Sequence, residues 1–64
     1  MPKTTIKVKL TGTDGNIFAL AGKVSTALEK KGHEDLAKEM RSAVMKSGSY
    51  SDALGVLADY VEVS

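Results

Sequence analysis

Residues 4–28, which read TTIKVKLTGTDGNIFALAGKVSTAL, decide the fold. In residues 4–11 apolar and polar side chains alternate, and this period of two predicts a half-buried β-strand. The apolar face of that strand would consist of three aliphatic residues: Ile6, Val8 and Leu10. Residues 12–16 are turn-forming and predict a tight connection. From Ile17 onward the apolar period is helical, with Asn16 as the expected N-cap.

Two more helices are expected after this one. The first helix should end at Gly32, the second should cover residues 34–46, and the third should begin after a cap at Ser49 or Ser51. The buried stripe of the third helix is expected to hold five residues, Tyr50, Ala53, Leu54, Leu57 and Val61, while Val56 and Tyr60 face another side.

A glycine in the middle of the first helix is unusual. Gly22 lowers helix stability by about 1 kcal/mol relative to alanine. A cost of that size predicts that another backbone or a ring comes close at this position.

The predicted fold is α+β and mainly α, with one N-terminal strand followed by three short helices in a single small domain, residues 1–64. Residues 1–3 are expected to be flexible. A lone strand leaves backbone groups unpaired, so it needs a partner. Two partners remain open: a short C-terminal strand within residues 61–63, which would place Glu62 on the same side as Lys7 and Lys9, or the same strand of a second copy.

Composition narrows the chemistry further. The chain has 64 residues, no Cys and one His, which excludes disulfides, a thiolate zinc site and a Cys nucleophile. We therefore expect no metal and no cofactor. A core of this size commonly needs support, and self-association is the favoured form. No apolar run is long enough to span a bilayer, so no membrane partner is expected.

The net charge of +1 hides two unlike halves. Residues 1–32 hold six lysines and two carboxylates, a net charge of +4, whereas residues 33–64 hold three cations and six carboxylates, a net charge of −3. This asymmetry fits an anionic partner or complementary packing between copies. Nucleic-acid binding is less favoured, because aromatic residues are few and the single Arg lies in the acidic half.

Two segments carry a resemblance to a known group of proteins. Residues 8–22, VKLTGTDGNIFALAG, and residues 46–54, KSGSYSDAL, resemble small uncharacterised bacteriophage and prophage proteins with a V-K-L-x-G-x-D-G-N-x-F-x-x-x-G segment and a later S-G-D-Y-x-x-L-L stretch. The chain departs from that pattern at Ser49, usually Asp in the group, and at Ile17, where a small residue is commoner. The resemblance covers nearly the whole chain and implies a phage accessory protein in the bacterial cytoplasm. It implies no catalytic residue.

An enzyme is not expected, because a domain this small offers no sealed pocket and the chain has no G-x-S-x-G elbow. The expected function is a homo-oligomer that counters host defence by sequestering a small anionic, nucleotide-type ligand. Inhibition of a host protein by surface binding stays open as the alternative. The candidate ligand-binding residues are polar or aromatic and lie near the ends of the expected elements: Lys9, Asn16, Phe18, Lys23, Arg41 and Tyr50. Each of the six also has an ordinary reading as a packing or surface residue.

Overall fold

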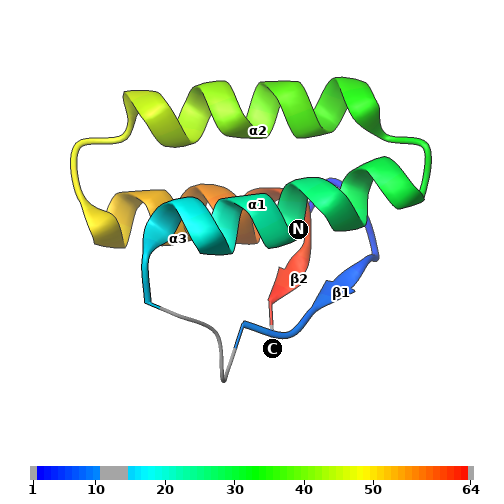
Figure 1. Ribbon diagram of the computed structural model, residues 1–64, viewed down its shortest axis with the longest axis horizontal. Helices are drawn as coiled ribbons and strands as arrows, with labels where there is room; N and C mark the ends of the chain where they lie inside the picture. Colours follow the sequence, from blue (N-terminus) through cyan, green and yellow to red (C-terminus); the bar gives the residue numbers. More distant parts are fainter. Residues whose placement is uncertain (1, 11–14, 64) are drawn as a thin grey trace.

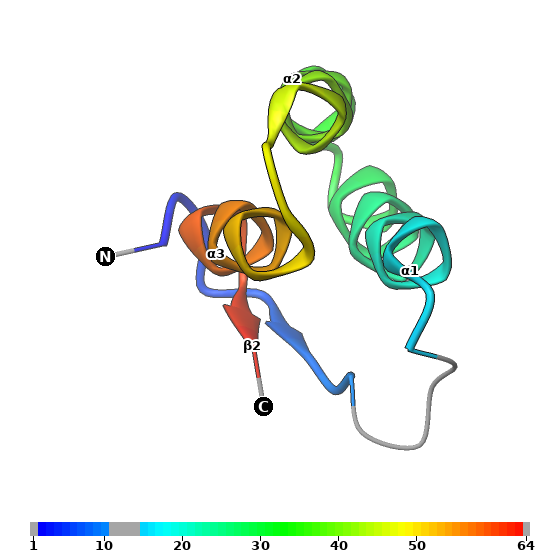
Figure 2. The same ribbon diagram turned by 90° about the vertical axis from the view of Figure 1, so that its left-hand side faces the viewer.

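Three helices and a two-stranded sheet form the part of the chain that the computed structural model describes, residues 2–10 and 15–63. Their order along the chain is β1 (Lys7–Val8), α1 (Ile17–Lys30), α2 (Glu34–Lys46), α3 (Tyr50–Tyr60) and β2 (Glu62–Val63). The helix α2 lies above α1 and α3, and the strands lie below them (Figure 1). A view along the helices shows α1, α2 and α3 at the corners of a triangle (Figure 2). The predicted α+β, mainly helical architecture is confirmed.

The strand pairing joins distant parts of the chain. The strands β1 and β2 are parallel, with Lys7 opposite Glu62 and Val8 opposite Val63. The backbone N–H of Glu62 donates to the carbonyl of Ile6 at 2.8 Å. Among the described residues β1 is shorter than the predicted strand, because β2 offers only two residues to pair with. The C-terminal partner is thus the one that the structure contains. Residues 12–14 of the predicted turn at residues 12–16, and Thr11 before them, lie outside the described residues.

The helix ends follow the sequence signals closely. The Asn16 side chain accepts a hydrogen bond of 2.8 Å from the N–H of Phe18, so Asn16 caps α1 as predicted. Gly32 follows α1 with a φ of 80°, a conformation that glycine adopts without a steric penalty. The hydroxyl of Ser49 accepts from the N–H of Asp52 at 3.1 Å, which makes Ser49 the cap of α3.

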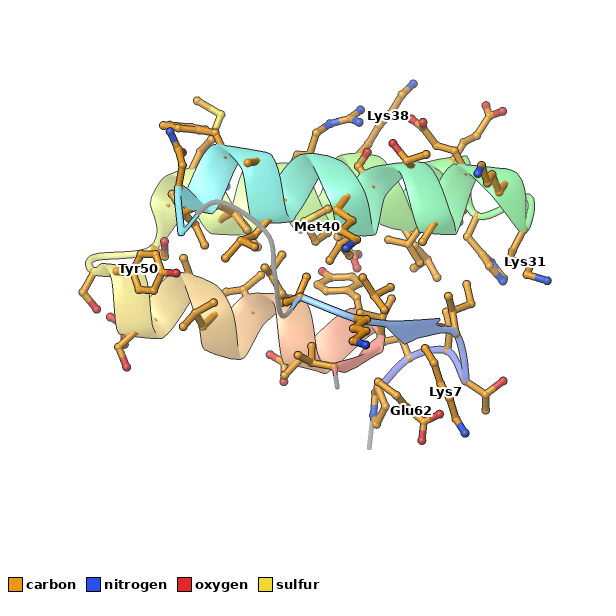
Figure 3. All side chains as sticks on the ribbon, turned by 60° about the horizontal axis from the view of Figure 1, so that its bottom comes forward. Lys7, Lys31, Lys38, Met40, Tyr50 and Glu62 are labelled. Atoms are coloured by element: carbon orange, nitrogen blue, oxygen red, sulfur yellow. The ribbon has the colours of Figure 1, made fainter. Side chains whose placement is uncertain are left out.

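The core lies between the three helices and above the sheet. Leu28, Met40 and Leu57 come from α1, α2 and α3 and are each fully buried. Met40 extends into the space that the helices enclose (Figure 3). Val8 from β1 and Val61, which precedes β2, are also buried in this cluster. The sheet therefore closes the open side of the helical bundle.

The burial of two tyrosines differs from the prediction. Tyr50 was predicted to be buried but has an exposed fraction of 49%, whereas Tyr60 was predicted to face another side and is 6% exposed. Tyr50 is the first residue of α3, at the end of the bundle, where less of the neighbouring helices covers it. Because α3 ends at Tyr60 and the chain turns extended at Val61, the inward face of α3 is made of Ala53, Leu57 and Tyr60.

The predicted close approach at Gly22 is wrong for the described residues. Gly22 is exposed, and a Cβ built on it meets no described atom within 4 Å. The Gly22 carbonyl accepts a hydrogen bond of 2.9 Å from the hydroxyl of Thr26, one turn further on. Packing inside this chain therefore gives no reason for a glycine here.

Candidate functional site

A groove at one end of the bundle carries much of the exposed apolar surface. It has a volume of about 370 Å³ and lies where α1 begins, α2 ends and α3 begins. Three large apolar side chains border it: Phe18, Met45 and Tyr50 are 70%, 80% and 49% exposed. We call this groove, with its full lining, the aromatic groove: Ile17, Phe18, Val44, Met45, Ser47, Gly48, Ser49, Tyr50 and Ala53.

Two segments far apart along the chain, residues 15–22 and residues 46–54, meet in this groove. Phe18 belongs to the first segment, and residues 47–50 belong to the second. A Cβ built on Gly15, also in the first segment, would lie 4.0 Å from the Tyr50 hydroxyl. The bundle brings these segments together because α1 and α3 both begin at this end (Figure 1).

The aromatic groove can hold a flat ring. Phe18 and Tyr50 supply aromatic faces, and the thioether of Met45 adapts to the shape of what it contacts. The volume falls within the range of small-molecule pockets, about 300–1,000 Å³. Among the described lining residues none is a carboxylate, so an anionic group on the ligand meets no like charge from them.

A second groove gathers lysines. It has a volume of about 380 Å³ and lies between β1 and α1. We call it the lysine groove, and its lining holds four lysines and three smaller residues: Lys7, Lys9, Lys23, Lys30, Val8, Thr26 and Ala27. Two of the six predicted ligand-binding residues, Lys9 and Lys23, meet here. The fold therefore divides the predicted site between two surfaces.

The other two predicted residues join neither lining. Asn16 caps α1 next to Phe18. Arg41 on α2 reaches α1, where it donates to the hydroxyl of Ser25 at 2.5 Å and lies 3.4 Å from the carboxylate of Glu29. Ser25 is buried, so Arg41 satisfies a polar group inside the interface between α1 and α2.

A cluster of polar and charged residues around Glu39 of α2 was not predicted from the sequence. Lys3 and Tyr60 both donate to the same oxygen of Glu39, at 2.8 and 2.7 Å, and the Lys3 ammonium lies 4.9 Å from the centre of the Tyr60 ring. The hydrogen bond from Lys3 is the main cause that lowers the pKa of Glu39, and the bond from Tyr60 adds to it. Burial is the main cause that raises the pKa of Tyr60, and the bond to Glu39 adds to it. The backbone N–H of Lys3 also donates to the carbonyl of Asp59, although residues 1–3 were expected to be flexible. No sequence spacing links these residues.

Among the described residues, no three His, Asp or Glu side chains gather as a cation site would require. None of the helices in residues 15–63 has the length and apolar character needed to cross a bilayer. Comparison with protein-family models, curated proteins and solved structures finds no match. The geometry of the two grooves is therefore the basis on which a function can be proposed.

Proposed function

We propose that this protein is a small phage accessory protein that counters bacterial defence by sequestering a nucleotide-type ligand. One observation carries the proposal: Phe18 and Tyr50 border a single groove while remaining 70% and 49% exposed. Large exposed apolar patches on small proteins commonly mark binding sites. The base of the ligand would lie against these rings.

The backbone N–H groups beside the groove suit the anionic part of such a ligand. The first turns of α1 and α3 border it, and backbone N–H groups in a first helical turn carry partial positive charge. An acid–base pair for catalysis is absent from the described lining, so the proposed role is capture without chemical change.

Self-association remains part of the proposal, but it is no longer supported by an unpaired strand. The strand β1 is already paired with β2, so backbone pairing no longer favours a second copy. The exposed surface of Phe18, Met45 and Tyr50 supports a homo-oligomer instead. Native mass spectrometry at micromolar concentration tests this part. A strictly monomeric protein would contradict it.

Thermal-shift measurements test the ligand. Cyclic nucleotides, cyclic dinucleotides and ADP-ribose derivatives are the probes, and a ligand at 100 times its Kd should stabilise the fold by about 2.7 kcal/mol. The variants Phe18→Ala and Tyr50→Ala should lose that shift, whereas Lys38→Gln on α2 should keep it. The ligand released by heating should be chemically unchanged. No shift with any probe at saturation would refute the proposal.

Inhibition of a host protein is the second candidate, and Met45 favours it. Its side chain is 80% exposed, and exposed methionines suit adaptable protein-binding surfaces. In that case Met45→Ala would weaken inhibition of a purified host enzyme together with Phe18→Ala, and the nucleotide screen would give no shift.

A further inference from the structure

All six lysines of the first half of the chain border two adjoining grooves. Besides the lysine groove, an open groove of about 840 Å³ runs along the N-terminal segment, and Lys7 lines both. We call the six residues the lysine track: Lys3, Lys7, Lys9, Lys23, Lys30 and Lys31. No carboxylate belongs to either lining among the described residues.

Two described carboxylates lie against the lysine track, and Lys23 already has a partner of its own. Glu39 forms its ion pair with Lys3, and Glu62 stands opposite Lys7 in the sheet, beside it in Figure 3. Lys9, Lys30 and Lys31 form no ion pair with the described carboxylates. The positive half of the sequence thus becomes one positive surface, away from Lys38, which extends from the other side of the bundle (Figure 3).

We propose that the lysine track binds the phosphate backbone of nucleic acid without reading its sequence. Duplex DNA carries one charge per about 1.7 Å of axis, and lysines that neutralise those charges release bound counterions. The protein measures 27 by 25 by 20 Å, so a phosphate chain that crosses it spans several nucleotides. Its lysines come from the N-terminal segment, β1 and α1, as an extended ligand requires.

The composition that argued against nucleic acid does not apply to this mode of binding. Aromatic residues stack on bases and arginines read base edges, whereas lysine contacts with phosphates need neither. The two grooves adjoin at Lys7, so their lysines form one extended row rather than a single convergent site. A long polyanion is therefore the better match.

Fluorescence anisotropy with a labelled duplex of about 20 base pairs tests the proposal. Each neutralised phosphate contributes about −0.9 to the slope of log K against log salt, so the four lysines Lys7, Lys9, Lys30 and Lys31 give a slope of about −3.6. Between 50 and 200 mM NaCl the affinity should fall by about two to three orders of magnitude. The triple variant Lys7→Gln/Lys9→Gln/Lys30→Gln should lower both the affinity and the slope. Each single variant, which is less exposed to folding defects, should reduce the slope by about 1.

Matched controls separate this site from the others. Lys38→Gln/Lys46→Gln changes the net charge on α2 and should leave DNA affinity within about threefold of the unmodified protein. Phe18→Ala should also leave it unchanged, because Tyr50 and the aromatic groove lie at the other end of the molecule from Lys7 and Lys31 (Figure 3). Equal weakening by the α2 variant, or no binding at 50 mM salt, would overturn the proposal. Neither result would affect nucleotide capture.

Discussion

The hydroxyl of Tyr60 donates a 2.7 Å hydrogen bond to Glu39, and thereby connects α3 to α2. Lys3 binds the same carboxylate oxygen at 2.8 Å and covers the Tyr60 ring. Thr4 adds a bond of 2.7 Å from its hydroxyl to the carbonyl of Tyr60. The N-terminal segment is thus attached to both helices through one buried tyrosine.

Removal of the Tyr60 hydroxyl should destabilise the fold. Tyr60→Phe keeps the buried ring but loses the bond to Glu39, which is worth about 1 kcal/mol because the carboxylate is half exposed. For a domain of this size that loss lowers Tm by about 4–8 °C in calorimetry. Tyr50→Phe is the matched control and should change the free energy of unfolding by less than about 0.5 kcal/mol. Equal effects of the two variants would contradict the assigned bond.

The stabilising effect of Glu39 should disappear in acid. Because its pKa in the folded protein lies below the ordinary value of 4.5, Glu39 contributes stability above that pH and loses it as the pH falls through the folded value. Urea unfolding of the unmodified protein and of Glu39→Gln should therefore differ above pH 4.5 and converge in more acidic buffer. The other carboxylates titrate in both proteins, so the difference isolates Glu39. A difference that grows on acidification would contradict this assignment.

An alanine at position 22 should make the protein more stable. A Cβ there meets no described atom within 4 Å, and alanine in a helix is favoured over glycine by about 0.5–1 kcal/mol. Gly22→Ala should therefore raise Tm by several degrees, whereas Gly32→Ala, at a φ of 80°, should lower it. If Gly22→Ala instead destabilised the protein or reduced its oligomeric mass, a second copy would pack at this position.

Arg41 should act on stability through Ser25. Arg41→Ala removes the donor to the buried Ser25 hydroxyl, which costs about 1–2 kcal/mol, and Ser25→Ala should recover part of that loss. A double-mutant cycle by urea unfolding measures the coupling, expected to be about 1 kcal/mol. Strictly additive effects would show that the two side chains do not interact. Nucleotide binding should be unaffected by Arg41→Ala, since Arg41 does not line the aromatic groove.

Local signals predicted the elements well because each is decided within a few residues. Asn16, Gly32 and Ser49 mark helix boundaries through hydrogen bonds and backbone angles close to them in sequence. The sequence also predicted that Glu62 would face the same side as Lys7 and Lys9 if the C-terminal strand paired with the first, and the register places Glu62 opposite Lys7. The burial of Tyr60 was predicted wrongly because it depends on where α3 ends and the chain becomes extended.

The candidate site was only partly predictable, because it depends on how the helices assemble. Phe18 was predicted to be a ligand-binding residue, but only the packed bundle shows that it shares a groove with Tyr50. Lys9 and Lys23 were chosen together with these aromatics, yet the fold places them beside other lysines. Met45 was not among the predicted ligand-binding residues, and only the packed bundle shows that it borders the groove with an exposed fraction of 80%.

The pairing of β1 with β2 also fixes the order in which the fold can form during synthesis. Residues 7–8 leave the ribosome before their partners at residues 62–63, which are made 55 positions later. The helices α1 and α2 are neighbours in sequence and can pack while translation continues, because local contacts form fastest. Val8 reaches its buried place only when β2 has emerged, so the nascent chain exposes this side of its core until then.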